Sequence, residues 1–303
     1  MKPPAYSESR GERFADLGQV TICYESIGRD SDPAMLVVVG LGAQLVAVSD
    51  EFCAELAGRG FRVIRFDNRD VGRSTTLSAR GTPSVWQLLR RDPTCMPYTL
   101  EDMTADSIGL LDTLGVERGH FVGFSMGGMI AQIAAARHAG RVASLASVMS
   151  STGSTRKGRP ALRFLRPALR RGPSKPDDAI ANRVAMAQSR GKGGAPEGQS
   201  ELWRVARLTH ARNDDRSGSR RQLGALISAG DRTKSLARIT APTVVVHGAA
   251  DRFVHPSGGR ATAAAIPGAS FHLVEGMAHN LPPSIRPRVV DLIATNAESA
   301  ERS

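Results

Sequence analysis

The sequence predicts an α/β protein in which helices cover both faces of a mostly parallel central sheet. Short apolar runs rich in β-branched residues alternate with segments of helical character, as expected for parallel strands joined by helices. The run at residues 35–39 is apolar throughout, which is typical of a strand buried on both faces. With 303 residues and 41% hydrophobic content, the chain can form the core of one large domain.

The first predicted elements are a hairpin and a strand–helix–strand unit. Apolar and polar residues alternate between residues 13 and 25, which predicts a β-hairpin. Ser49 or Asp50 is a suitable N-cap for the next helix, and Gly60 favours the end of that segment. In order, we expect the hairpin, a strand at 35–39, a helix from 50 to 56 and a strand at 61–66.

The remaining predicted elements follow the same alternation. Thr99, with Asp102 three residues later, resembles a capping box and predicts a helix that continues to Leu114. Further strands are expected at 119–122, 142–149, 243–247 and 270–274, and further helices at 126–137 and 287–297. No internal repeat is visible.

Positive charge is concentrated in one segment of the chain. The formal net charge is +11, but 17 Lys and Arg against 6 Asp and Glu lie between Arg156 and Arg221, so the remainder is balanced. This segment also has poor apolar patterning and a glycine-rich stretch at 191–198, which is typical of a flexible connection. We therefore predict a core formed by residues 1–151 and 232–303, and an inserted basic helical lid at residues 152–231.

The sequence lacks the features of membrane, secreted and metal-binding proteins. Its longest apolar run, residues 34–43, is about half the length that a helix needs to cross a bilayer, so no membrane span is expected. No apolar stretch follows the charged N-terminal residues, which predicts a cytoplasmic protein. The three cysteines include no Cys-x-x-Cys pair. We expect no metal and no cofactor.

One motif predicts a nucleophile. Gly123-Phe124-Ser125-Met126-Gly127 matches Gly-x-Ser-x-Gly, the tight strand-to-helix turn that raises a serine oxygen above a sheet. An apolar run precedes the motif and a good helix former follows it, so the context fits. The alternative is a glycine-rich loop whose serine only caps the helix. Because a serine hydroxyl is a poor nucleophile by itself, the first interpretation also requires a base and an acid that orients it.

Asp251 and His279 are the candidates for these two roles. Each follows a predicted strand by a few residues, so both are expected at the carboxyl edge of the sheet, together with Ser125. The order Ser, Asp, His along the chain is the order known for this architecture. Either residue can instead be an ordinary loop residue, and His255, close to Asp251 in sequence, is the only plausible spare base.

Two backbone N–H groups are expected to bind the oxyanion of a tetrahedral intermediate. One belongs to Met126, directly after the serine, and the other belongs by position to Leu41 in the loop after the strand at 35–39. Many enzymes of this kind have His-Gly-x-Gly in that loop. Here Val39 stands in place of the histidine, so another group must brace the loop.

The same loop allows a rival interpretation. Residues 40–45 follow a strand and precede a helix, and Asp67 ends the next strand, which resembles a dinucleotide-binding fingerprint. However, the third glycine position is Leu45, and a nicotinamide site leaves Ser125 without a role.

With these residues placed, the chain resembles the α/β-hydrolase superfamily over roughly residues 13–152 and 236–298. Residues 67–74, Asp-Asn-Arg-Asp-Val-Gly-Arg-Ser, are similar to that superfamily's Asp-x-Arg-Gly-x-Gly-x-Ser loop, with Asp70 in place of the usual Gly. This variant and the loop without histidine are similar to the aclacinomycin methylesterase group and related carboxylesterases. The resemblance implies hydrolysis of a small-molecule carboxylic ester through an acyl-serine. It implies that Ser125 is the nucleophile, His279 the base and Asp251 the acid that orients the base. It also implies that Leu41 and Met126 form the oxyanion hole.

Other functions use the same residues. Lactone hydrolysis, carbon–carbon bond hydrolysis and perhydrolysis all employ a serine triad. A hydrolase-like receptor that binds a ligand with little turnover is an alternative of a different functional class.

For the basic lid we predict a helix face formed by Arg159, Arg163, Arg166 and Arg170. It is interpreted as a solvated surface, or as a face that steers anionic substrates; nucleic-acid binding is disfavoured because aromatic residues are scarce there.

Overall fold

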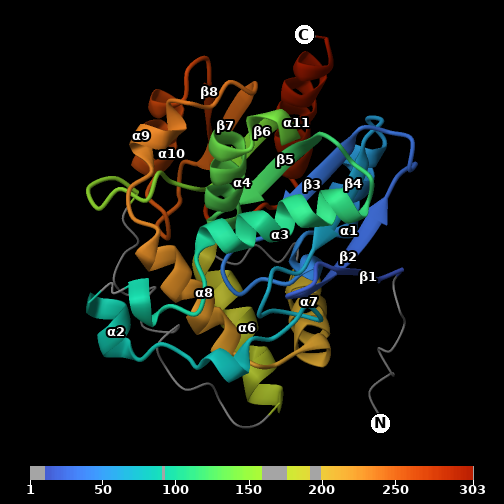
Figure 1. Ribbon diagram of the computed structural model, residues 1–303. Coiled ribbons are helices and arrows are strands. Elements are labelled where there is room, and N and C mark those ends of the chain that lie inside the picture. The colour runs from blue at the N-terminus through green and yellow to red at the C-terminus, as the bar shows by residue number, and fades with distance from the viewer. Residues whose placement is uncertain (1–10, 91–92, 159–175, 192–198, 303) are drawn as a thin grey trace.

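A single eight-stranded sheet organises the molecule (Figure 1). The computed structural model describes residues 11–90, 93–158, 176–191 and 199–302. The strands lie in the order β1-β2-β4-β3-β5-β6-β7-β8, and all neighbours from β4 to β8 are parallel. Their bounds are β1 Arg13–Asp16, β2 Thr21–Ile27, β3 Ala34–Val38, β4 Arg62–Phe66, β5 Gly119–Phe124, β6 Val142–Val148, β7 Thr243–Gly248 and β8 Ser270–Val274. The predicted α/β class is confirmed.

The strands match their predicted positions closely. β1 and β2 pair antiparallel, so the predicted hairpin is confirmed, and β2 also pairs antiparallel with β4. β3 is apolar throughout because successive side chains enter different cores: Leu36 and Val38 belong to one buried cluster, and Met35 and Val37 to the other.

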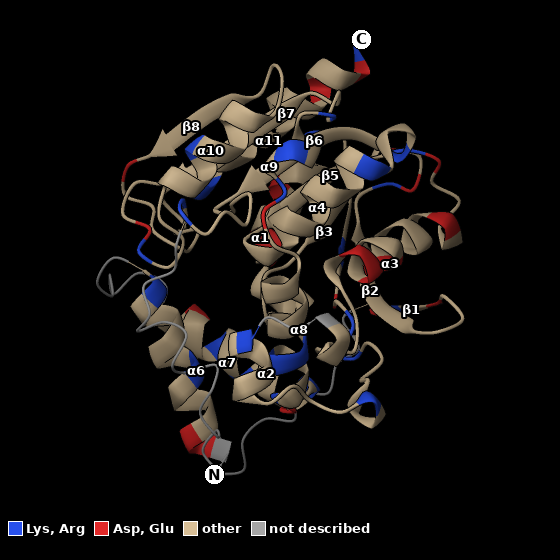
Figure 2. Ribbon diagram, turned by 60° about the vertical axis from the view of Figure 1, so that its left-hand side comes forward, with Lys and Arg blue, Asp and Glu red and all other residues tan. Residues whose placement is uncertain are grey.

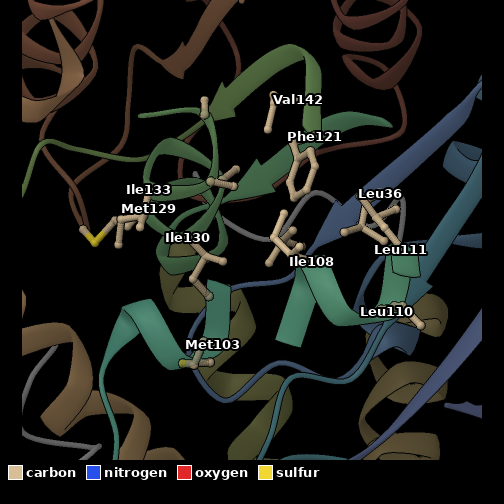
Figure 3. Close-up of a cluster of buried hydrophobic side chains, with 14 of the residues drawn as sticks. Leu36, Met103, Ile108, Leu110, Leu111, Phe121, Met129, Ile130, Ile133 and Val142 are labelled. Carbon is tan, nitrogen blue, oxygen red and sulfur yellow. The ribbon is translucent and has the colours of Figure 1, made fainter. Parts of the chain in front are cut away.

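Helices cover both faces of the sheet (Figure 1). On one face, α3 (Leu100–Thr113) and α4 (Met126–Arg137) pack on the strands; on the other, α1 (Asp50–Ala57) packs beside α11 (Arg286–Glu301). Figure 3 shows part of the first cluster, in which Leu36 and Phe121 of the strands lie near Leu111 of α3 and Ile130 of α4. The site is therefore built on a sheet whose two faces are both covered.

Two predicted caps are present at helix starts. The Ser49 hydroxyl accepts the N–H of Phe52 at 3.2 Å and caps α1. At α3, the Thr99 hydroxyl accepts the N–H of Asp102 while the Asp102 carboxylate accepts the N–H of Thr99, which is a capping box.

Three short helices outside the predicted lid are missing from the sequence prediction. They are α2 (Val85–Arg90), α9 (Thr233–Leu236) and α10 (Ser257–Ala265), and α10 contains two glycines, which disfavour a helix. α10 is held by its packing against β7 and β8, which local sequence does not encode. α11 also extends beyond the predicted end at residue 297.

Most of the described part of the segment between β6 and β7 is helical, apart from residues 149–158 and the short connections between its helices. It contains α6 (Pro176–Arg190), α7 (Gln199–Arg212), α8 (Ser217–Ser228) and, at its end, α9 (Thr233–Leu236). Arg residues recur along α6, α7 and α8, which lie together on one side of the sheet (Figure 2). The predicted arginine face at 159–170 and most of the glycine-rich stretch at 191–198 lie outside the described residues. The division into core and lid stays a prediction.

None of the helices within the described ranges combines enough length with enough apolar character to span a bilayer.

Gly127 is expected to be indispensable for folding. A Cβ atom there would lie 2.0 Å from the carbonyl oxygen of Val38, a backbone atom that cannot move aside. Because overpacking against side chains already costs about 1–3 kcal/mol, Gly127→Ala should cost at least about 3 kcal/mol. Thermal unfolding should show a Tm roughly 5 °C or more below that of the unmodified protein, or no folded protein.

Gly140→Ala is the matched control, because no atom lies within 4 Å of the position its Cβ would take. Its Tm should be unchanged. Equal Tm values for the two variants would contradict the assigned constraint.

Candidate active site

The predicted turn at Ser125 is present between β5 and α4. Ser125 has a φ of 54° and a ψ of −115°, a backbone conformation that non-glycine residues rarely adopt. Glycine is required on both sides: a Cβ at Gly123 would lie 2.3 Å from the carbonyl oxygen of Gly127. The Ser125 N–H donates to the carbonyl oxygen of Val148 at 2.9 Å, and the Ser150 hydroxyl donates to the Ser125 carbonyl at 2.7 Å. The candidate nucleophile therefore lies in a strained turn in which both its N–H and its carbonyl oxygen are hydrogen-bonded.

The structure brings together the three side chains that the sequence predicts. His279 Nε2 lies 3.1 Å from Ser125 Oγ, and His279 Nδ1 lies 2.7 Å from Asp251 Oδ2. Ser125 precedes α4, whereas Asp251 follows β7 and His279 follows β8, so three parallel strands deliver them to one edge of the sheet. These separations are those of a nucleophile, a base and an acid that orients the base.

Asp251 is buried but held in its charged form. Its Oδ1 accepts the N–H groups of Phe253 at 2.8 Å and Val254 at 2.9 Å, and its Oδ2 lies 3.3 Å from Nε2 of His247. Burial raises the pKa of Asp251, but hydrogen bonds from His247 and His279 outweigh that effect and lower the pKa to about 2. The carboxylate is therefore charged at every pH at which the protein is expected to work.

His279 is 8% exposed, and its surroundings favour the neutral imidazole. Burial lowers the pKa of His279; Asp251 opposes this shift, and the positive charge of Arg190 adds to it. Arg190 forms no ion pair or side-chain hydrogen bond within the described part of the chain. A neutral imidazole can accept a proton at Nε2, which is what a general base requires.

The last residue of α6 contacts the His279 loop directly. The His279 N–H donates to the Arg190 carbonyl oxygen at 3.0 Å. The Arg190 guanidinium lies 5.3 Å above the Phe253 ring, whose centroid is 4.6 Å from that of His279. Sequence reasoning missed this contact, because nothing in the segment around Arg190 indicates a neighbour so far along the chain.

The loop predicted to carry the second oxyanion donor lies against the serine. A Cβ at Gly40 would lie 3.3 Å from the Ser125 Cβ. Met126 is the first residue of α4, so its N–H has no carbonyl partner within the helix. The roles of Leu41 and Met126 as oxyanion donors stay predictions.

His255, the spare base considered from the sequence, takes no part in this arrangement. Its Nδ1 lies 2.9 Å from the Ser257 hydroxyl at the exposed start of α10. His247 sits inside β7 and its Nε2 lies 2.9 Å from the carbonyl oxygen of Val254. Its additional contact with Asp251 was not predicted.

The dinucleotide interpretation is disfavoured by the surroundings of Asp67. The carboxylate is fully buried and already accepts four hydrogen bonds: from the N–H of Leu45 at 2.7 Å, from the N–H of Arg73 at 2.9 Å, and from Nη2 and Nη1 of Arg212 at 2.6 Å and 3.3 Å. A ribose hydroxyl has no access to it. Across residues 11–90, 93–158, 176–191 and 199–302, no group of three His, Cys, Asp or Glu side chains is arranged to hold a metal ion.

Comparison with known proteins identifies the class. The family described as alpha/beta hydrolase fold matches residues 33–282, and the chain therefore belongs to it. The chain is 26% identical over 322 aligned residues to rhodomycin D methylesterase DauP of Streptomyces sp. (strain C5), covering 95% of this chain and 98% of the relative. Rhodomycin D methylesterase DnrP of Streptomyces peucetius is 25% identical with the same coverage. The resemblance to the methylesterase group is confirmed.

The solved structures agree on the fold. A hydrolase from Pseudomonas aeruginosa PA01 superposes with a TM-score of 0.74 at 23% identity, covering 95% of this chain and 99% of the other.

The rate of catalysis should rise with pH as His279 loses its proton. Since burial lowers the pKa of His279 below 6.5, kcat/KM is expected to fall only as the pH drops through a value below 6.5. Asp251, with a pKa of about 2, adds no second ionisation above pH 4. Initial rates on a neutral ester between pH 4 and 9 measure the profile. A midpoint at or above pH 7 would contradict this assignment.

Replacement of each of the two candidate histidines, His279 and His255, should show which one is the base. His279→Ala removes the base and is expected to lower kcat by about 10⁴-fold or more, because the members of a triad act as a unit. His255→Ala removes an exposed side chain and should leave kcat within about twofold. Both variants should give the same far-UV circular dichroism. The reverse order of severity would make His255 the base.

Proposed function

We propose that this protein is a serine hydrolase that cleaves a small-molecule carboxylic ester through an acyl-serine intermediate. The observation that carries the proposal is the continuous hydrogen-bonded chain from Ser125 Oγ through His279 to Asp251, with separations of 3.1 Å and 2.7 Å. Ser125 is the nucleophile, His279 the base and then the acid, and Asp251 the group that orients and stabilises the imidazolium.

In the first half of the reaction, Ser125 Oγ attacks the ester carbonyl carbon while its proton passes to His279 Nε2. The carbonyl oxygen becomes an oxyanion, which accepts the N–H groups of Leu41 and Met126. The intermediate then collapses: the carbon–oxygen bond to the alcohol breaks, and the alcohol leaves with the proton from His279. The acyl group remains on Ser125.

In the second half, His279 removes a proton from water, and the resulting oxygen attacks the acyl carbon. A second tetrahedral intermediate forms at the same donors. It collapses with the return of the proton to Ser125 Oγ, and the carboxylic acid is released. Asp251 stays ionised throughout and balances the positive charge on His279.

The methylesterase relatives support an ester as the substrate, and a methyl ester in particular. Lactone hydrolysis, carbon–carbon bond hydrolysis and perhydrolysis use the same triad and stay alternatives, as does a binding protein with little turnover. We further propose residues 152–231 as the lid over this site. The proposed reaction requires no metal or cofactor.

The test is turnover of a panel of p-nitrophenyl and methyl esters by the unmodified protein and by Ser125→Ala. Removal of the nucleophile should lower kcat by about 10⁴- to 10⁶-fold without changing the Tm. Ser107→Ala is the matched control, because the Ser107 hydroxyl is buried in α3 and donates only to the carbonyl of Met103. It should retain full activity.

Exhaustive treatment with a chelator should leave the rate unchanged. Retention of more than a few per cent of the activity by Ser125→Ala, or loss of activity to the chelator, would overturn the mechanism. A lack of saturable turnover on any ester would favour the binding protein.

A further inference from the structure

The loop after β3, which carries Leu41, lacks the histidine that braces it in many enzymes of this class. In the sequence, Val39 stands in place of a histidine and Asp70 in place of a glycine. Asp70 has a φ of 72°, so an aspartate occupies a backbone conformation that favours glycine. Both departures lie at the edge of the sheet that carries Ser125, and each must be compensated by contacts from elsewhere.

The backbone strain at Asp70 is compensated by an ion pair with Arg221 of α8. Arg221 donates from Nε to Asp70 Oδ2 at 2.8 Å and from Nη2 to Asp70 Oδ1 at 2.7 Å, and both side chains are fully buried. Asp70 Oδ1 also accepts the N–H of Leu77 at 2.7 Å. This bidentate ion pair, together with the hydrogen bond that Arg221 Nη1 donates to the Thr82 hydroxyl at 2.9 Å, fixes the position and rotation of α8 against the core.

The next residue of α8, Gln222, contacts the loop after β3 that carries Leu41, which is the oxyanion loop of the proposed reaction. Gln222 is fully buried, and its Oε1 accepts the N–H of Gly42 at 2.8 Å. Its Nε2 donates to the carbonyl oxygen of Arg69 at 2.8 Å. One side-chain amide therefore joins the loop that carries Leu41 to the loop that carries Asp70.

The fit between α8 and these loops leaves little room for movement. A Cβ at Gly218 would lie 1.9 Å from the carbonyl oxygen of Asp70, and a Cβ at Gly42 would lie 2.6 Å from the Ser219 hydroxyl. The loop itself is a turn in which the Ala43 N–H donates to the carbonyl of Gly40 at 3.1 Å and Gly42 has a φ of 67°. The Gln222 bond fixes the central peptide of this turn, which joins Leu41 to Gly42.

We infer that Gln222 is a positioning residue for ester hydrolysis, and that it holds the oxyanion loop from the inserted segment in place of the missing histidine. This inference rests on the proposed function. Gln222 acts through Leu41 and does not touch the substrate. Since oxyanion donors contribute only when they are aligned before the reaction, a loosened turn weakens binding of the transition state more than binding of the substrate.

The test is Gln222→Met, which preserves volume and removes both hydrogen bonds. Loss of one oxyanion donor costs about 10²- to 10³-fold in kcat, so misalignment of one donor should cost about 10- to 100-fold, with KM within about threefold. Inhibition by phenylboronic acid, whose boron becomes tetrahedral on Ser125, should weaken by the same factor as kcat/KM. The Gly42 amide should exchange its hydrogen faster.

Gln132→Met is the matched control. Gln132 is also fully buried, but its Nε2 donates to the Ser147 hydroxyl, away from the oxyanion loop. It should keep the kcat and the Gly42 exchange rate of the unmodified protein. Gln222→Glu keeps an acceptor for the Gly42 N–H, so it should lose less kcat than Gln222→Met, and it serves as the test variant if the methionine variant does not fold.

The outcomes distinguish this inference from the proposed function. A Gln222→Met protein with kcat within twofold of the unmodified protein, or with a change in KM alone, would overturn the inference, as would equal losses in Gln222→Glu and Gln222→Met. If the unmodified protein hydrolyses no ester, the proposed function fails, and the Gly42 exchange rate still decides whether Gln222 braces the loop.

Discussion

The close approach of α4 to the sheet is the constraint on which the site depends. Gly123 and Gly127 allow the first turn of α4 to lie against backbone atoms of β3 and β5, where no side chain fits. This approach forces Ser125 into its positive-φ conformation and raises its hydroxyl above the sheet. Because β3 and β5 are neighbours while the chain between them first visits β4, the serine lies where the strand order reverses. That is the crevice in which open parallel sheets bind ligands.

The electrostatics of the triad follow from burial and from the number of donors around one carboxylate. Burial alone would favour neutral Asp251, but two backbone N–H groups and two histidines stabilise its charge. Burial also disfavours a charged His279, and Arg190 acts in the same direction. The result is a charged carboxylate beside a neutral imidazole, which is the arrangement that the proposed proton transfer from Ser125 requires. In the proposed reaction, Asp251 balances the positive charge that develops on His279.

The segment between β6 and β7 contributes to the site at two points. The Arg190 carbonyl at the end of α6 binds the N–H of His279, and α8 binds both loops beside Ser125 through Arg221 and Gln222. The buried Arg221–Asp70 pair explains why an aspartate occurs at a position that favours glycine: the ion pair and the Leu77 N–H compensate the backbone strain. The basic segment is thus attached to the core by specific buried contacts, whatever the role of its exposed arginines.

The sequence by itself determined the fold class, nearly every strand, and the choice of Ser125, His279 and Asp251, the three side chains that the structure joins by hydrogen bonds. It could do so because strand burial, helix caps and the Gly-x-Ser-x-Gly turn depend on neighbours in the chain, and because parallel strands end at one edge. Tertiary structure alone decided four other features. These are the contact of His247 with Asp251, the hydrogen bond from the His279 N–H to the Arg190 carbonyl, the formation of α10, and the hydrogen bond from the Gly42 N–H to Gln222. Gln222 lies 180 residues from Gly42, and one hydrogen bond between a glutamine and a backbone N–H leaves no pattern in either segment. Only the packing of α8, fixed by Arg221 on Asp70, brings the two together.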